Sequence, residues 1–133
     1  MNNFDATIKN ICTDSDVDRA WHNLIELGKE AVPAMIRAFR NDSNSEKKAW
    51  LLSAIAENRE PLYDFYKECL LDPKKPVWNQ SITALCTLGS TESEKVLLAV
   101  RGQLEAARIE STKREYIDEA IEIIREQRSQ GPA

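Results

Sequence analysis

The sequence predicts an all-α protein, specifically a right-handed α-solenoid of about three helix pairs with a capping helix at each end. The 133 residues include only four glycines and five prolines, so long irregular loops are not expected. Apolar residues recur at intervals of three and four, which is the spacing of one face of a helix. The string Leu-x-x-Leu-Gly occurs at residues 24–28 and again at 85–89, which indicates an internal repeat.

The first half of the chain predicts four helices. Residues 1–15 hold a capping helix, because one face carries Phe4, Ile8, Ile11 and Cys12. The acidic stretch "TDSDVD" suits the start of a second helix, residues 16–27, which Gly28 ends. Pro33 is accommodated in the first turn of a third helix, residues 32–40. Ser45 is expected to cap a fourth helix, residues 46–57.

The second half predicts four more helices. Pro61 is expected to repeat the role of Pro33 and open a fifth helix, residues 61–71. A sixth helix, residues 77–88, ends at Gly89. Thr91–Glu94 and Thr112–Glu115 have the Thr-x-x-Glu spacing of a capping box. These two boxes are expected to open a seventh helix, residues 91–107, and a C-terminal capping helix, residues 111–128.

Three helix pairs therefore fill residues 16–107, and we expect residues 1–133 to form a single domain. One pair cannot bury its apolar side alone, whereas stacked pairs build one continuous core. The recurrence of tryptophan at positions 21, 50 and 78 supports a regular spacing of the helix pairs. The middle pair is the least regular, since Glu57 stands where glycine is expected. Tetratricopeptide repeats are a weaker alternative, because their period is longer than the one seen here.

The stretch "LIELGKEAVPAMIRAF" resembles the short HEAT-like repeats of bacterial and phycobilisome-lyase-like proteins. The first pair fits that pattern through Ala20, Leu24, Leu27, Gly28, Ala31, Pro33 and Ile36. The third pair fits it, without the proline, through Ser81, Leu85, Leu88, Gly89, Leu97 and Leu98. The resemblance implies an α-solenoid whose second helices line a concave face that binds a partner.

Charge and cysteine content narrow the functional classes. The chain has 18 Lys and Arg against 22 Asp and Glu, a net charge of −4. This balance disfavours a phosphate-backbone binder and suits a basic protein partner. Cys12, Cys69 and Cys86 match no zinc or redox spacing, so they are expected to be buried free thiols. The N-terminus resembles no signal peptide and no apolar run could span a bilayer, which predicts a cytoplasmic protein.

The sequence shows no assembled catalytic chemistry. His22 is the sole histidine, and there is no phosphate-binding loop and no nucleophile elbow. We therefore expect no enzyme activity, no metal and no cofactor. Lys74, Lys75 and Trp78 raise the alternative of a HEAT-like DNA glycosylase, in which basic and aromatic side chains would hold nucleic acid. A core tryptophan beside two solvated lysines is the stronger interpretation, because the chain is acidic.

The candidate partner-binding residues lie on the third, fifth and seventh helices. They are the non-core positions Tyr63, Asp64, Lys67, Glu68, Arg37 and Arg101. Tyr63, expected to be exposed among carboxylates, suits a protein interface. The predicted function is an immunity protein that binds and neutralises a bacterial toxin, with a basic toxin domain as the partner. An adaptor or assembly factor with a constitutive protein partner is the alternative.

Overall fold

The computed structural model describes residues 4–108 and 112–129. Within these ranges the chain forms eight α-helices and a short 3-10 turn, and no strand. The all-α prediction is therefore confirmed for the part of the chain described. The chain divides into two compact units, Met1–Glu60 and Pro61–Ala133, and each is described by itself. No helix among the described residues is both long and apolar enough to cross a membrane.

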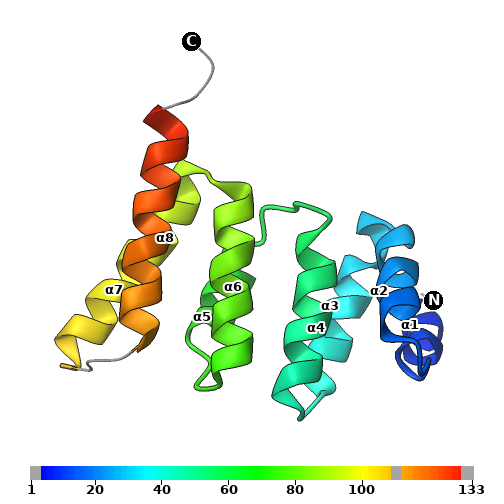
Figure 1. Ribbon diagram of the computed structural model, residues 1–133. Coiled ribbons are helices and arrows are strands. Elements are labelled where there is room, and N and C mark those ends of the chain that lie inside the picture. The colour runs from blue at the N-terminus through cyan, green and yellow to red at the C-terminus, as the bar shows by residue number, and fades with distance from the viewer. Residues whose placement is uncertain (1–3, 109–111, 130–133) are drawn as a thin grey trace. The chain divides into compact units, whose positions relative to one another are not determined.

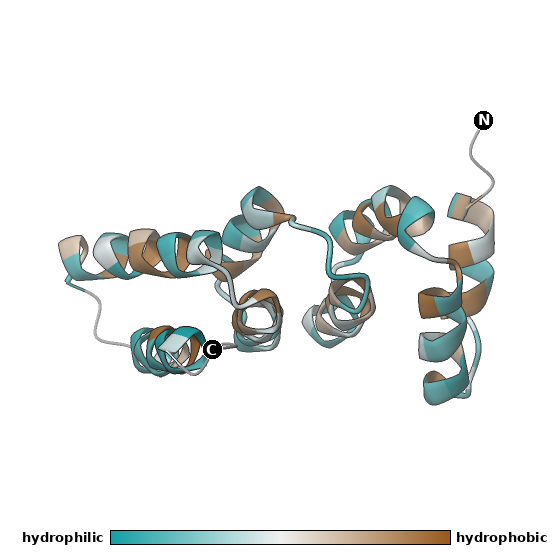
Figure 2. Ribbon diagram, turned by 90° about the horizontal axis from the view of Figure 1, so that it is seen from above, coloured by the Kyte–Doolittle hydropathy of each residue, from teal (hydrophilic) through white to brown (hydrophobic). Residues whose placement is uncertain are grey.

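The first unit contains α1 (Phe4–Cys12), α2 (Val17–Glu26), the 3-10 turn Lys29–Ala31, α3 (Val32–Asn41) and α4 (Ser45–Ala56) (Figure 1). Helix α1 packs on α2 and α3, and α4 packs on the same two helices. Each helix thus buries one side against its neighbours, and apolar residues alternate with polar ones along the helices (Figure 2). The core of this unit includes Ile8, Leu24, Met35, Leu52 and Ile55.

Polar side chains fix the helix starts in the first unit. The Asp16 carboxylate caps α2 by accepting the backbone N–H of Arg19 at 3.1 Å. Asp14 accepts the N–H of Asp16 and forms a two-point pair with the Arg19 guanidinium at 2.8 Å. The hydrogen bonds from Arg19 lower the pKa of Asp14 to about 2. The cap of α4 is Asn44, and the prediction of Ser45 was wrong by one residue.

The second unit contains α5 (Tyr63–Leu70), α6 (Lys75–Leu88), α7 (Thr91–Ala106) and α8 (Thr112–Ser129). Helix α6 packs on α5, α7 and α8, and α7 packs on all three other helices. Each of these helices therefore has at least two partners, and the core forms where they meet. It includes Tyr66, Leu70, Leu85, Leu97, Ile117 and Ile124.

Two predicted helix starts and one predicted cap in the second unit differ from the structure. Helix α5 begins at Tyr63, so Pro61 lies outside its first turn. Helix α6 begins at Lys75, and Pro76 takes the position expected of Pro61. Helix α7 is capped by Ser90, whose hydroxyl accepts the N–H of Ser93 at 3.1 Å, and not by Thr91. The described part of helix α8 begins at Thr112, and residue 111, where the predicted helix begins, lies outside the described residues.

The two copies of Leu-x-x-Leu-Gly occupy matching environments. Leu24 and Leu85 are both 0% exposed, whereas Leu27 and Leu88 are half-buried. Gly28 and Gly89 both follow a helix, as predicted, and they have positive φ, +80° and +56°. Where the middle pair has no glycine, the chain takes its left-handed turn at Arg59, with φ of +53°.

Each of the two Leu-x-x-Leu-Gly strings lies within one unit, so their similarity does not depend on how the units are arranged. The predicted pairing of the fourth helix with the fifth joins residues of different units. That pairing, the single domain and the right-handed solenoid therefore remain predictions.

Candidate functional site

The predicted residues on α5 divide into buried and exposed positions. One side of α5 is committed to the core through Phe65, Tyr66, Cys69 and Leu70. Asp64 and Glu68 are exposed one turn apart, and Lys67 is half-buried. The other side of α5 thus presents two carboxylates to solvent.

Tyr63 does not have the exposed ring expected from the sequence. It is half-buried, and its hydroxyl lies 2.7 Å from Oγ of Ser90, the residue that caps α7. The bond joins the start of α5 to the start of α7. Tyr63 therefore stabilises the packing of these two helices, in addition to any contact that it makes with a partner.

Arg101 is committed to ion pairs between α7 and α8. Its Nε lies 2.7 Å from Oδ1 of Asp118 and 3.5 Å from Oε1 of Glu105. Glu105 also pairs with Arg114 at 3.0 Å. A partner that bound Arg101 would have to compete with these two carboxylates.

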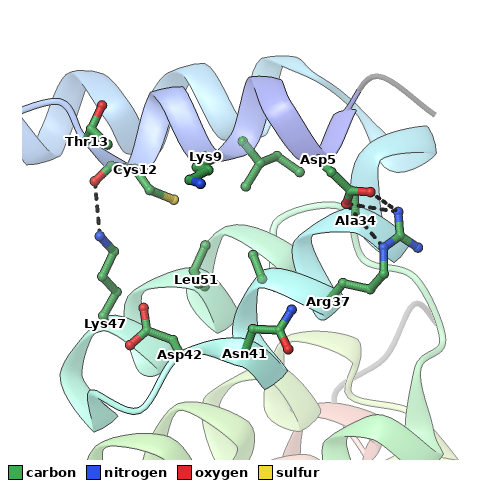
Figure 3. A pocket seen from close by; sticks show the side chains of 12 residues that line it. Asp5, Lys9, Cys12, Thr13, Ala34, Arg37, Asn41, Asp42, Lys47 and Leu51 are labelled. Atoms are coloured by element: carbon green, nitrogen blue, oxygen red, sulfur yellow. Dashed lines mark hydrogen bonds and ion pairs between the residues drawn. The ribbon is translucent and has the colours of Figure 1, made fainter. Parts of the chain in front are cut away.

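Arg37 lies in the first unit, whereas the other five predicted residues lie in the second. Its Nη2 is 3.1 Å from Oδ1 of Asp5, so the side chain connects α3 to α1. Arg37 also lines a groove of about 570 Å³ between α1, α3 and α4 (Figure 3). We call this space the α1 groove.

The α1 groove combines an apolar floor with a polar edge. Its floor includes Ile8, Ala34 and Leu51, each only 1% exposed. At one end the Nζ of Lys47 donates a 3.0 Å hydrogen bond to the carbonyl oxygen of Cys12 (Figure 3). The sequence did not predict this groove. Cys12 and Lys47 are 35 residues apart, and no local pattern connects them.

The suspected nucleic-acid spot is not an exposed aromatic platform. Trp78 is buried, and its ring meets the edge of Tyr116 at a centroid distance of 5.5 Å. The Nζ of Lys75 lies 5.0 Å from the Tyr116 ring centre, which places this lysine against the protein's own aromatic side chain. Trp78 is therefore a core residue, as the stronger interpretation expected.

No group of three or more His, Cys, Asp or Glu side chains among the described residues is placed to hold a metal ion. His22 is exposed and packs edge-on against Trp21 at 5.2 Å. This arrangement gives the histidine a packing contact.

The cysteines are less uniform than predicted. Cys69 is buried, whereas Cys12 and Cys86 are half-buried, so the expectation of three buried thiols was wrong for two of them. Burial raises the pKa of both half-buried thiols. The nearby Lys47 ammonium opposes this effect at Cys12, and the Glu119 carboxylate adds to it at Cys86.

We expect the native protein to react with an aromatic disulfide reagent at Cys12 and Cys86, slowly, and not at Cys69. The raised pKa values leave little thiolate near neutral pH, and thiolate is the reactive form. Mass spectrometry of labelled peptides at successive times, with the unfolded chain as the fast reference, measures each rate. Rapid labelling of Cys69 would contradict the packing described here.

Comparisons with protein-family models, with curated proteins and with solved structures gave no match.

Proposed function

We propose that the protein is a non-enzymatic binding module for a basic protein, and most specifically an immunity protein that neutralises a bacterial toxin. The observation that supports this proposal best is the exposed side of α5. Asp64 and Glu68 lie there one turn apart, on a helix anchored through Phe65 and Cys69. Carboxylates on a well-packed helix are positioned before the partner arrives, which lowers the entropic cost of binding.

The charge of the chain as a whole also favours a basic protein partner. Residues 1–60 contain eight Lys and Arg against ten Asp and Glu, and residues 61–133 contain ten against twelve. The acidic excess is thus distributed along the chain. Such a charge distribution attracts a basic partner during diffusional encounter and raises the association rate.

The proposal predicts that Asp64→Lys combined with Glu68→Lys slows association with a basic toxin domain by about tenfold at low salt. The reason is local repulsion, so the effect should shrink as salt rises. Stopped-flow binding to basic nuclease-toxin domains, starting with any encoded by neighbouring genes, measures the rate. Inhibition of the toxin's nuclease activity provides the functional readout.

Glu122→Lys with Glu126→Lys is the matched control. These two glutamates are also exposed and one turn apart, but they lie on α8. The control changes the net charge equally, so it should slow association much less. An equal loss in both variants would show that overall charge, and not the α5 surface, guides binding. Tyr63→Phe tests the tyrosine separately, because it removes only the bond to Ser90.

The adaptor alternative shares the surface and differs in the partner. An adaptor would co-purify with a constitutive partner and would leave toxin activity unchanged. The glycosylase alternative requires exposed aromatic and basic side chains, and the burial of Trp78 counts against it. Salt-dependent binding to duplex DNA in a mobility-shift assay would favour that alternative.

A further inference from the structure

The α1 groove is spanned by a polar connection toward each end. At one end the Asp5–Arg37 pair joins α1 to α3, and at the other Lys47 joins α4 to the carbonyl of Cys12 (Figure 3). A partner helix lying in a groove needs open ends to pass through. The two connections instead bound a space of about 570 Å³, which is in the range of small-molecule sites.

The charges that line the α1 groove differ from those of the chain as a whole. The Asp5 carboxylate is paired with Arg37, whereas Asp42 accepts the neutral backbone N–H of Asn44 at 2.8 Å, so its formal negative charge is not offset by that bond. Lys9 is exposed and makes no ion pair within the described residues. Lys47 is bonded to a neutral carbonyl, so its positive charge remains. The α1 groove therefore carries three cationic side chains, Lys9, Arg37 and Lys47, against the two carboxylates of Asp5 and Asp42, which is a net charge of +1 in a protein of net charge −4.

We propose that the α1 groove binds a small amphiphilic carboxylate, with its hydrocarbon part on the apolar floor and its carboxylate held by Lys9 and Lys47. Ile8, Ala34 and Leu51 form the floor, and the half-buried Cys12 and Ala38 beside them supply apolar surface that the hydrocarbon would cover. Charge-assisted hydrogen bonds from the ammonium groups would orient the carboxylate. This binding is independent of the α5 surface and of any protein partner.

A second groove offers an internal comparison. It lies between α6 and α8, has a volume of about 320 Å³, and includes Cys86, Ile82, Ala120 and Ile123. Its charged residue is Glu119, a carboxylate. Both grooves have apolar surface and a half-buried thiol, but their charges are opposite. A carboxylate ligand should therefore prefer the α1 groove, whereas hydrophobicity alone would not distinguish them.

Protection of the two thiols tests the proposal. The folded protein is labelled with a thiol reagent in the presence of increasing laurate, below the concentration at which laurate forms micelles. We expect saturable slowing of Cys12 labelling by tenfold or more, with Cys86 labelling unchanged. Dodecylammonium, which has the same chain length and the opposite charge, should not protect Cys12. Equal protection of both thiols by laurate, or of Cys12 by both amphiphiles, would overturn the proposal.

Substitutions at other positions of the groove locate the ligand, with Cys12 labelling kept as the reporter. Lys9→Gln with Lys47→Gln should raise the half-protecting laurate concentration about tenfold, whereas Lys29→Gln, on the exposed 3-10 turn, should leave it unchanged. Lys9→Gln alone should give a smaller increase without disturbing the Lys47 bond to Cys12. Ala38→Trp places a large ring at the half-buried edge of the groove and should abolish protection. Undiminished protection in all of these variants, or no laurate protection of the wild type, would exclude the site.

Discussion

Leu24→Ala is expected to lower the free energy of unfolding by about 2–5 kcal/mol, and Leu85→Ala by a similar amount. Both side chains are fully buried at the same position of the Leu-x-x-Leu-Gly repeat. Truncation removes their apolar contacts and leaves a cavity that the surrounding helices fill only partly. Urea or guanidinium unfolding followed by circular dichroism measures the change, with the slope compared between variants.

Leu27→Ala and Leu88→Ala are the matched controls for this pair. They remove the same atoms at the other leucine of each repeat, where the side chain is half-buried. We expect these two substitutions to lower the free energy of unfolding by less, because less apolar surface is lost from the core. If Leu85→Ala proved no more costly than Leu88→Ala, the equivalence of the two repeats would be wrong.

Gly28→Ala is expected to lower the free energy of unfolding by about 1–3 kcal/mol. Gly28 has φ +80° and ψ −178°, a backbone conformation essentially restricted to glycine. A Cβ built there meets no atom within 4 Å, so the loss would come from backbone strain and not from a clash. Thermal and denaturant unfolding of the variant measure the loss.

Gly102→Ala is the control, and its effect should have the opposite sign. Gly102 is an exposed residue inside α7, and a Cβ there also meets nothing within 4 Å. Alanine in a helix interior is better than glycine by roughly 0.5–1 kcal/mol, because it restricts the unfolded chain. A stabilised Gly28→Ala variant would contradict the conformation described at this turn.

The sequence by itself determined the helices and much of the core. Helix content follows from local spacing, because a stripe of apolar residues at three- and four-residue intervals can be buried only by a helix. The helix ends at Gly28 and Gly89 were predicted in the same way, from the glycine that follows each apolar stripe. These features depend on residues near one another in the chain.

Helix starts were less predictable because neighbouring polar residues compete to cap them. Asn44 and Ser45 can both cap a helix, as can Ser90 and Thr91. The choice shifts the first turn by one residue. The shift leaves the apolar side of the helix unchanged, so the spacing of apolar residues does not decide between two neighbouring caps.

Only the tertiary structure decided what the predicted site residues do. Tyr63 was placed correctly on α5, yet its hydroxyl is hydrogen-bonded to the hydroxyl of Ser90, 27 residues later in the chain. Arg37 and Arg101 looked available for a partner, but carboxylates from other helices hold them. The α1 groove likewise exists only where three helices meet. Periodicity reports which side of a helix is apolar, and it contains no information on which distant side chain will face the polar side.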